Sequence, residues 1–144
     1  MLRIAGRLLI ALLATAGLAA AAEPTPVGVW LHSNGRIQME IYPCGEDLCG
    51  KLVWFKYPNN DDGTPRTDVN NPDPTLRAPP LMGLQVLHGL RRTDDGWEDG
   101  TVYNPDDGET YSTEMTILPD GTLRTRGYIL ITLIGKTVIW TRVT

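Results

Sequence analysis

The sequence has few of the side chains on which most metal and catalytic centres depend. Its 144 residues include two cysteines, two histidines and one phenylalanine, and only 7% of them are aromatic. A structural zinc site needs four ligands, and Cys44, Cys49, His32 and His88 have no ligand-like spacing. No nucleophile, base and orienting group can be named together. We therefore predict no metal site, no cofactor and no catalytic residue, and we expect the protein not to be an enzyme.

Positive charge and long apolar runs are also scarce. The chain has 13 lysine and arginine residues against 17 aspartate and glutamate residues, whereas nucleic acids and anionic lipid surfaces attract basic patches. The main apolar run, residues 8–18, is shorter than the roughly 20 residues that a membrane-spanning helix needs. The sequence therefore argues against a nucleic acid partner and against a membrane-spanning protein.

The start of the chain has the three parts of a secretory signal. Two arginines precede the apolar residues 8–18, and the small residues 19–22 provide a cleavage site before Glu23. We predict that residues 1–22 are removed and that residues 23–144 form a single domain. This domain would be exported, either periplasmic or secreted, with no stable membrane insertion after cleavage. Cleavage removes two of the 13 basic residues and no acidic residue, which leaves a net charge of −6.

Two cysteines, Cys44 and Cys49, lie close together in the predicted mature domain. In an oxidising compartment a closely spaced pair usually forms a disulfide. Reduced thiols or thiols bound to a metal are the alternative, but a metal site would need further ligands. We therefore predict a disulfide between Cys44 and Cys49.

Tight-turn dipeptides divide the mature sequence into short segments. Asn-Gly or Asp-Gly pairs tolerate the positive φ of hairpin turns, and four of the five pairs present separate runs of β-forming residues. No segment has a persuasive helical period. The predicted strands cover residues 27–32, 36–42, 50–57, 83–92, 96–103, 110–118, 122–129 and 136–143.

Alternation along these segments indicates an antiparallel sheet with one dry face. Ile37, Met39 and Ile41 share one face of their strand, whereas Gln38 and Glu40 share the other. If the sheet closes into a barrel, the dry face lines its interior. The candidate ligand-binding residues are Ile37, Met39, Ile41, Tyr111, Thr113, Met115, Ile117, Leu123 and Thr125.

One connection, residues 58–80, is rich in proline, asparagine and aspartate and is unusually long for a compact domain. Asp73 before Pro74 predicts one short helical turn. The preceding strand is apolar on both faces at residues 52–55, so we expect this loop to cover its outer face. The acidic residues of the loop lack the spacing of an EF-hand and are better explained as turn formers.

Tryptophans lie in the first and the last predicted strands of the mature sequence. Gly28-Val29-Trp30 opens the first mature strand, and Trp140-Thr141-Arg142 ends the last one. This arrangement resembles the lipocalin pattern, in which a tryptophan of the first strand plugs the closed end and a basic side chain packs across it. The resemblance implies barrel closure by Gly28, Trp30 and Arg142, and a guanidinium stacks well on an indole face.

A wider resemblance covers nearly all of residues 27–143. The cysteine pair, the Asn71-Pro72-Asp73-Pro74 loop, Gly96-Trp97 and Arg126-Gly127-Tyr128 occur in order. The sequence resembles a family of small exported bacterial proteins of unknown function, the domain of unknown function 2147. The resemblance implies a lipocalin-like barrel in the cell envelope, and it implies no activity.

We therefore expect an all-β fold, a single antiparallel up-and-down barrel of about eight strands with one long loop. An interior of this size can hold one small ligand or be filled by side chains. The leading hypothesis is a non-enzymatic exported protein that binds a small apolar or amphipathic molecule. The alternative is a filled barrel that contacts a protein partner through loop 58–80.

Overall fold

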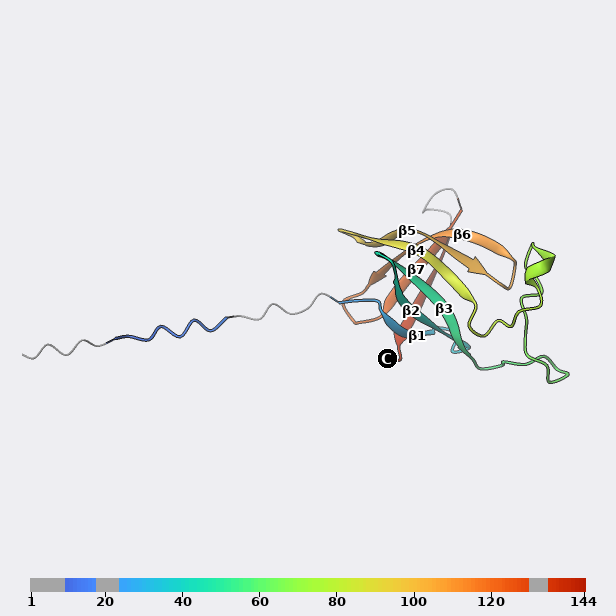
Figure 1. The fold of residues 1–144 in the computed structure, drawn as a ribbon, viewed down its shortest axis with the longest axis horizontal. Helices are drawn as coiled ribbons and strands as arrows, with labels where there is room; N and C mark the ends of the chain where they lie inside the picture. Colours follow the sequence, from blue (N-terminus) through green and yellow to red (C-terminus); the bar gives the residue numbers. More distant parts are fainter. Residues whose placement is uncertain (1–9, 18–23, 130–134) are drawn as a thin grey trace, which may run out of the picture.

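Eight antiparallel strands close into a barrel, and a long connection extends from one end of it (Figure 1). The computed structural model describes residues 10–17, 24–129 and 135–144, and most of the predicted signal peptide lies outside these ranges. The strands are β1 (Gly28–His32), β2 (Ile37–Cys44), β3 (Asp47–Phe55), β4 (Gln85–Thr93), β5 (Gly96–Asn104), β6 (Glu109–Ile117), β7 (Leu123–Tyr128) and β8 (Gly135–Arg142).

Each strand pairs with its neighbours in the chain, and β1 pairs with β8 to complete the barrel. Gly35 and Gly121 have φ values of 69° and 84°, which explains the Asn-Gly and Asp-Gly pairs at these turns. The predicted all-β, up-and-down barrel is therefore confirmed. Within the described ranges, no helix is long and apolar enough to cross a membrane.

The apolar run in β3 is explained by a bulge. Trp54 pairs with Gln38 and Leu52 pairs with Met39, so the register shifts by one residue at Val53. Leu52 and Phe55 are both buried, while Trp54 is 39% exposed. The expectation that loop 58–80 covers the outer face of this strand is wrong for Trp54. The bulge, rather than a covering loop, accommodates four apolar residues in a row.

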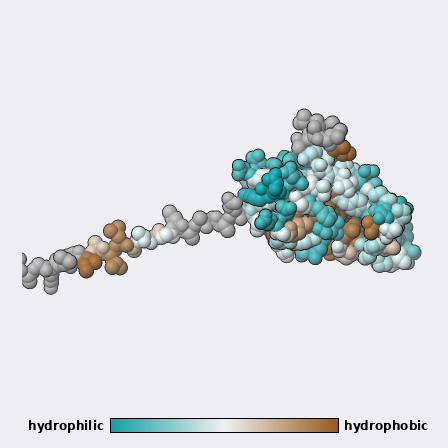
Figure 2. Space-filling view, turned by 45° about the horizontal axis from the view of Figure 1, so that its top comes forward, coloured by the Kyte–Doolittle hydropathy of each residue, from teal (hydrophilic) through white to brown (hydrophobic). Residues whose placement is uncertain are grey.

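The core is most densely packed towards one end of the barrel. Its most buried side chains include Trp30, Ile41, Leu90, Met115 and Leu123. Two inward-facing glycines make room for this packing: a Cβ at Gly100 would lie 2.6 Å from Leu90 Cγ, and one at Gly50 would lie 3.0 Å from Leu87 Cβ. We call this end the closed end. The outer surface in view is mostly hydrophilic, with small hydrophobic areas (Figure 2).

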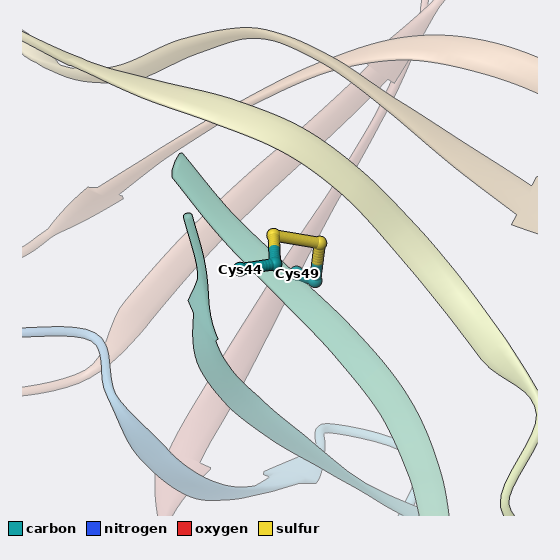
Figure 3. The surroundings of a disulfide bond; sticks show 2 residues. All are labelled: Cys44 and Cys49. Carbon is teal, nitrogen blue, oxygen red and sulfur yellow. A yellow bond between two sulfur atoms is a disulfide. The ribbon is translucent and has the colours of Figure 1, made fainter. Parts of the chain in front are cut away.

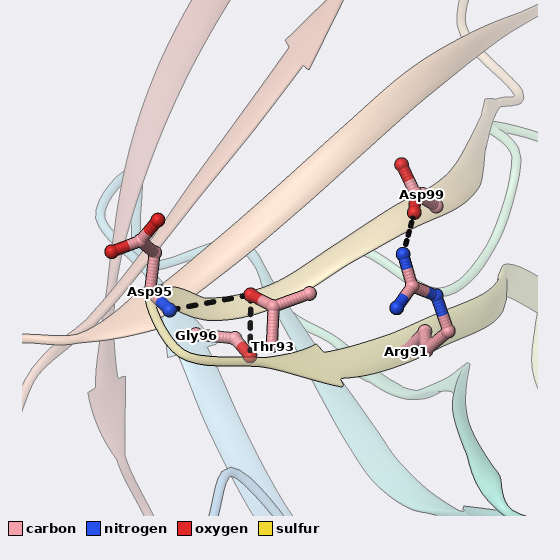
Figure 4. Close-up of polar contacts among 5 residues, drawn as sticks. All are labelled: Arg91, Thr93, Asp95, Gly96 and Asp99. Carbon is pink, nitrogen blue, oxygen red and sulfur yellow. Dashed lines mark hydrogen bonds and ion pairs between the residues drawn. The ribbon is translucent and has the colours of Figure 1, made fainter.

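Polar contacts stabilise the β4–β5 hairpin at the closed end (Figure 4). The Asp95 backbone N–H donates to Thr93 Oγ1 at 3.3 Å. Farther along the hairpin, Arg91 forms an exposed ion pair with Asp99, whose φ of 60° is unusual for a residue with a side chain. The register of β5 against β6 shifts between Trp97 and Gly100. Asp99 therefore lies in a bulge that directs its carboxylate towards Arg91.

The predicted disulfide between Cys44 and Cys49 is present and links the ends of β2 and β3 (Figure 3). The two cysteines are five positions apart and flank a tight turn in which Gly45 has a φ of 68°. Cys49 is buried. The bond therefore constrains a hairpin that already has a defined register.

Replacement of both cysteines by serine should lower the free energy of unfolding by about 2 kcal/mol, because a short loop is no longer constrained in the unfolded chain. Urea unfolding of the variant and of the oxidised and reduced wild type checks this value. Alkylation of the purified protein without reductant should label neither cysteine. Labelling of both thiols would contradict the disulfide.

Candidate ligand-binding cavity

The half of the barrel opposite the closed end encloses a cavity of about 760 Å³. Its rim is formed by the β1–β2 turn, the β3–β4 connection, the β5–β6 turn and the adjacent ends of β7 and β8. We call this rim the mouth. The volume lies within the usual range for pockets that hold a small molecule. An apolar wall surrounds it, formed largely by Met39, Leu52, Phe55, Leu81, Val86, Leu87, Val102, Val138 and Trp140.

The structure separates the nine predicted ligand-binding residues into two groups by depth. Ile37, Met39, Tyr111, Thr113 and Thr125 line the cavity. The others, Ile41, Met115, Ile117 and Leu123, lie in or against the packed core of the closed end. Alternation identifies the inward face of a strand, but it does not indicate how far along the barrel axis the empty space extends.

Gly127 of β7 also lines the cavity, and it differs from the other inward glycines. A Cβ at Gly127 would have Val102 Cγ1 as its nearest atom, at an ordinary contact distance of 3.5 Å. At Gly50 and Gly100 the corresponding space is already filled. The absence of a side chain at Gly127 therefore contributes open volume rather than close packing. The Arg126-Gly127-Tyr128 motif was the sequence signal that could have indicated Gly127 as a residue of the cavity wall.

Three polar side chains of the cavity wall form hydrogen bonds within the protein. Thr113 Oγ1 donates to the Arg126 carbonyl at 3.0 Å, and Trp140 Nε1 donates to Thr125 Oγ1 at 2.9 Å. Among the described residues, no buried side-chain nitrogen or oxygen lacks a hydrogen-bond partner. Together with the apolar wall, these internal hydrogen bonds favour an apolar group in the interior.

Charges gather at the mouth. Arg36, Arg66 and Lys136 line it together with Asp106 and Asp107. Asp107 accepts hydrogen bonds from the Tyr111 hydroxyl at 2.5 Å and from the Glu109 backbone N–H at 2.8 Å. These bonds, the first above all, lower the pKa of Asp107. Its carboxylate is thus held by groups of its own turn.

His32 lies at the mouth, with its ring edge-on to Trp140 at a centroid distance of 4.8 Å. Its Nδ1 accepts the Asn34 backbone N–H at 2.9 Å, so the neutral ring carries its proton on Nε2. Burial, followed by the positive charge of Lys136, lowers the pKa of His32. His32 is thus held by a local hydrogen bond of the β1–β2 turn.

Acidification should destabilise the protein partly through His32. Because the folded state lowers the pKa of this group, the unfolded chain takes up the proton first, and stability falls as the pH drops through about 6.5. His32→Gln removes this contribution, so the melting temperature should fall less between about pH 7.5 and about pH 5. His88→Gln, at an exposed position of β4, is the control. Equal pH dependence in all three proteins would contradict the assignment.

The closed end is sealed by the residues that the lipocalin resemblance indicated. Trp30 is fully buried, and Arg142 Cζ lies 4.2 Å from the centroid of its ring. The Arg142 guanidinium also donates to the backbone carbonyls of Thr25 at 2.6 Å and Val27 at 3.1 Å. A Cβ at Gly28, where φ is 139°, would lie 2.3 Å from the Thr144 carbonyl oxygen. Gly28 therefore permits close contact between the two ends of the barrel chain.

A buried carboxylate attaches loop 58–80 to the barrel. Asp68 is 1% exposed, and it accepts hydrogen bonds from the Tyr103 hydroxyl at 2.7 Å and from Asn71 Nδ2 at 2.9 Å. Asn70 Nδ2 donates to the Pro105 carbonyl at 3.0 Å. Burial, followed by the hydrogen bond to Asp68, raises the pKa of Tyr103 to about 12, so its hydroxyl remains a donor at neutral pH.

Two other acidic residues of the loop have local roles. Asp62 and Asp73 accept hydrogen bonds from Thr64 and Thr75 within their own turns. Asp73 also caps the short 3-10 helix at Pro74–Leu76, as predicted. Within the described residues, no group of three or more histidine, cysteine, aspartate or glutamate side chains could hold a metal ion.

Tyr103→Phe should lower the free energy of unfolding by about 1–3 kcal/mol, because it leaves a buried oxygen of Asp68 without its partner. Hydrogen exchange of loop 58–80 should become faster. Tyr111→Phe is the matched control, since it removes a hydroxyl that binds the exposed Asp107. Unchanged exchange in Tyr103→Phe would show that Asp68 does not attach the loop.

These features define a lipocalin-like barrel, with a cavity at one end and a buried tryptophan at the other. The chain belongs to the family described as "Uncharacterized protein conserved in bacteria (DUF2147)", which matches residues 28–142. Both the predicted family and the predicted fold are thus confirmed. No curated protein matched the sequence.

One similar solved structure is described as "Protein HP1028 from the human pathogen Helicobacter pylori belongs to the lipocalin family". It is 22% identical, with 82% of each chain covered and a TM-score of 0.68. At this level of identity the likeness shows the fold.

Proposed function

We propose that this protein is an exported, non-enzymatic carrier that binds one small apolar or amphipathic molecule in the barrel cavity. The observation that carries the proposal is the cavity of about 760 Å³ with a largely apolar wall, in which Thr113, Thr125 and Trp140 form hydrogen bonds within the protein. Such a wall offers burial of apolar surface as the driving force for binding. The fold is compatible with this role, because a barrel of eight strands can hold one small ligand.

Export is supported by two independent features. The first 22 residues have the composition of a secretory signal, and Cys44 and Cys49 form a disulfide, a bond that persists in oxidising compartments. Fractionation of the native host should place the protein outside the cytoplasm, with an N-terminus at Glu23. A cytoplasmic protein that retains Met1 would contradict export.

The carrier role is tested by solvent extraction of protein purified from its native compartment, followed by mass spectrometry. We expect one small molecule in stoichiometric amount. Gly127→Phe, which places a ring in the cavity, should give an extract without it. An empty extract from folded wild-type protein, together with no binding of an added amphipathic probe, would contradict the proposal.

The alternative, a protein contact through loop 58–80, has its own supporting observation. Val69 and Leu76 are 65% and 51% exposed on this loop, and conspicuous loops on rigid scaffolds often carry recognition. The double variant Val69→Ser/Leu76→Ser should then lose a defined partner that cross-links to the wild type in the envelope. If the carrier role alone is correct, this double variant should still bind the ligand.

A further inference from the structure

The positive charges of the mouth are confined to one side of the barrel. Because the strands follow one another around a closed barrel, β8, β1, β2 and β3 form one continuous half. Lys136 belongs to β8, Arg36 precedes β2, and Arg66 lies in the loop that follows β3. Asp106 and Asp107 lie in the β5–β6 turn, on the other half. We call the three cations the basic rim.

Within the described ranges, the cations of the basic rim are not held in ion pairs, although Asp61 and Asp62 line a neighbouring surface pocket together with Arg66. Among the residues that the structure describes, no carboxylate lies within ion-pair distance of Arg36, Arg66 or Lys136. Arg66 is directed over the apolar wall, with Cζ 5.9 Å from the centroid of the Phe55 ring, and its Nη1 donates to the Tyr57 carbonyl at 3.5 Å. A positive charge thus lies where the apolar interior meets solvent.

Of the two acids on the other side of the mouth, Asp107 is less available to a ligand. The Asp107 carboxylate already accepts the Tyr111 hydroxyl and the Glu109 N–H, and the five charged side chains of the mouth have a net charge of +1. This local excess stands against the net charge of −4 of the whole chain. The mouth therefore favours an anionic group over a cationic one.

We infer that the ligand is a single-chain amphipathic anion, with its carboxylate or phosphate head at the basic rim and its apolar chain in the cavity. This inference rests on the proposed carrier function and specifies its ligand class. Along this path the chain would pass Phe55 near the mouth and reach Met39 and Leu87 in the interior. The head would remain partly in water, where Arg36, Arg66 and Lys136 can donate charge-assisted hydrogen bonds to it.

The test compares ligands that share one tail and differ in the head. The probes for isothermal titration of the mature protein are decanoate, decyl phosphate, 1-decanol and decyltrimethylammonium. Their affinities separate the contribution of the shared tail from that of the charge on the head. We expect the anions to bind about tenfold more tightly than the alcohol at low salt, and to lose much of this advantage as salt is raised. The preferred anion then distinguishes a carboxylate from a phosphate head.

A charge-matched pair of variants locates the effect. Arg36→Gln/Lys136→Gln removes two charges of the basic rim and should weaken anion binding about tenfold, with binding of the alcohol unchanged. Lys51→Gln/Arg91→Gln removes two charges that pair with Glu40 and Asp99 outside the cavity, and it should bind all four probes as the wild type does.

Two results would overturn the inference in distinguishable ways. Equal affinity for decanoate and 1-decanol, or unchanged anion binding in Arg36→Gln/Lys136→Gln, would exclude the basic rim while leaving the carrier function intact. Binding of none of the probes by folded wild type would instead count against the carrier function itself.

Discussion

Replacement of Trp30 by alanine should lower the free energy of unfolding by about 3–5 kcal/mol, the usual cost of truncating a buried tryptophan. Trp30 is fully buried at the closed end. Its loss would leave a void, remove the ring beneath Arg142 and leave the Pro26 carbonyl without the indole N–H that it accepts at 2.8 Å. Urea unfolding followed by circular dichroism measures the effect.

Trp54→Ala is the matched control, because it removes the same side chain from the outer face of β3, where Trp54 is 39% exposed. We expect a loss of about 1 kcal/mol or less. Similar losses in the two variants would show that Trp30 is an ordinary aromatic residue rather than the plug of the closed end. A loss of about 4 kcal/mol in the Trp30→Ala variant would be a large part of the free energy of unfolding of a typical domain.

Gly127→Phe should nearly abolish ligand binding while leaving the barrel folded. A side chain at this position begins with an ordinary van der Waals contact to Val102 and extends into the cavity that Gly127 lines. A ligand forced to share this volume would lose about 2–3 kcal/mol of binding free energy, which corresponds to a Kd roughly 30- to 150-fold higher. Titration with decanoate checks this value.

The outward-facing variant Ser112→Phe is the control for Gly127→Phe. Ser112 lies in β6, at an exposed position opposite Tyr128 of β7, so the added ring would remain outside the barrel. Its decanoate affinity should equal that of the wild type. If Gly127→Phe were folded and bound decanoate with unchanged affinity, the ligand would have to lie elsewhere.

The sequence alone was sufficient to predict the strands, because each carries a local signal. Alternation around Met39 and turn pairs such as Asn34-Gly35 depend on near neighbours in the chain, and the structure has strands and a turn at these places. The helical turn at Asp73 was predicted for the same reason, since a capping carboxylate and the following proline act within one turn. Family resemblance added the closed barrel and the contact between Trp30 and Arg142.

The features that could not be predicted depend on contacts between distant parts of the chain. The bulge at Val53 becomes visible only when β3 is paired with β2. The burial of Asp68 depends on Tyr103, which is 35 positions away. The basic rim, likewise, comes together only when the first and last strands pair.

The predicted binding residues illustrate the same limit within single strands. Tyr111 and Met115 are equivalent in the alternation of β6, but Tyr111 lines the cavity, whereas Met115 is 1% exposed in the core. Periodicity along one strand distinguishes inside from outside. It does not distinguish filled volume from empty volume, which depends on side chains contributed by all the other strands.

The pairing of β1 with β8 makes the last part of the chain decisive for how the protein behaves before folding is complete. A chain shortened before Gly135 would lack β8, and both β1 and β7 would then have unpaired backbone donors and acceptors along one side. Such open edges readily associate with other chains. The complete barrel has no free edge, so a nearly complete chain would be far more prone to aggregation than the finished one.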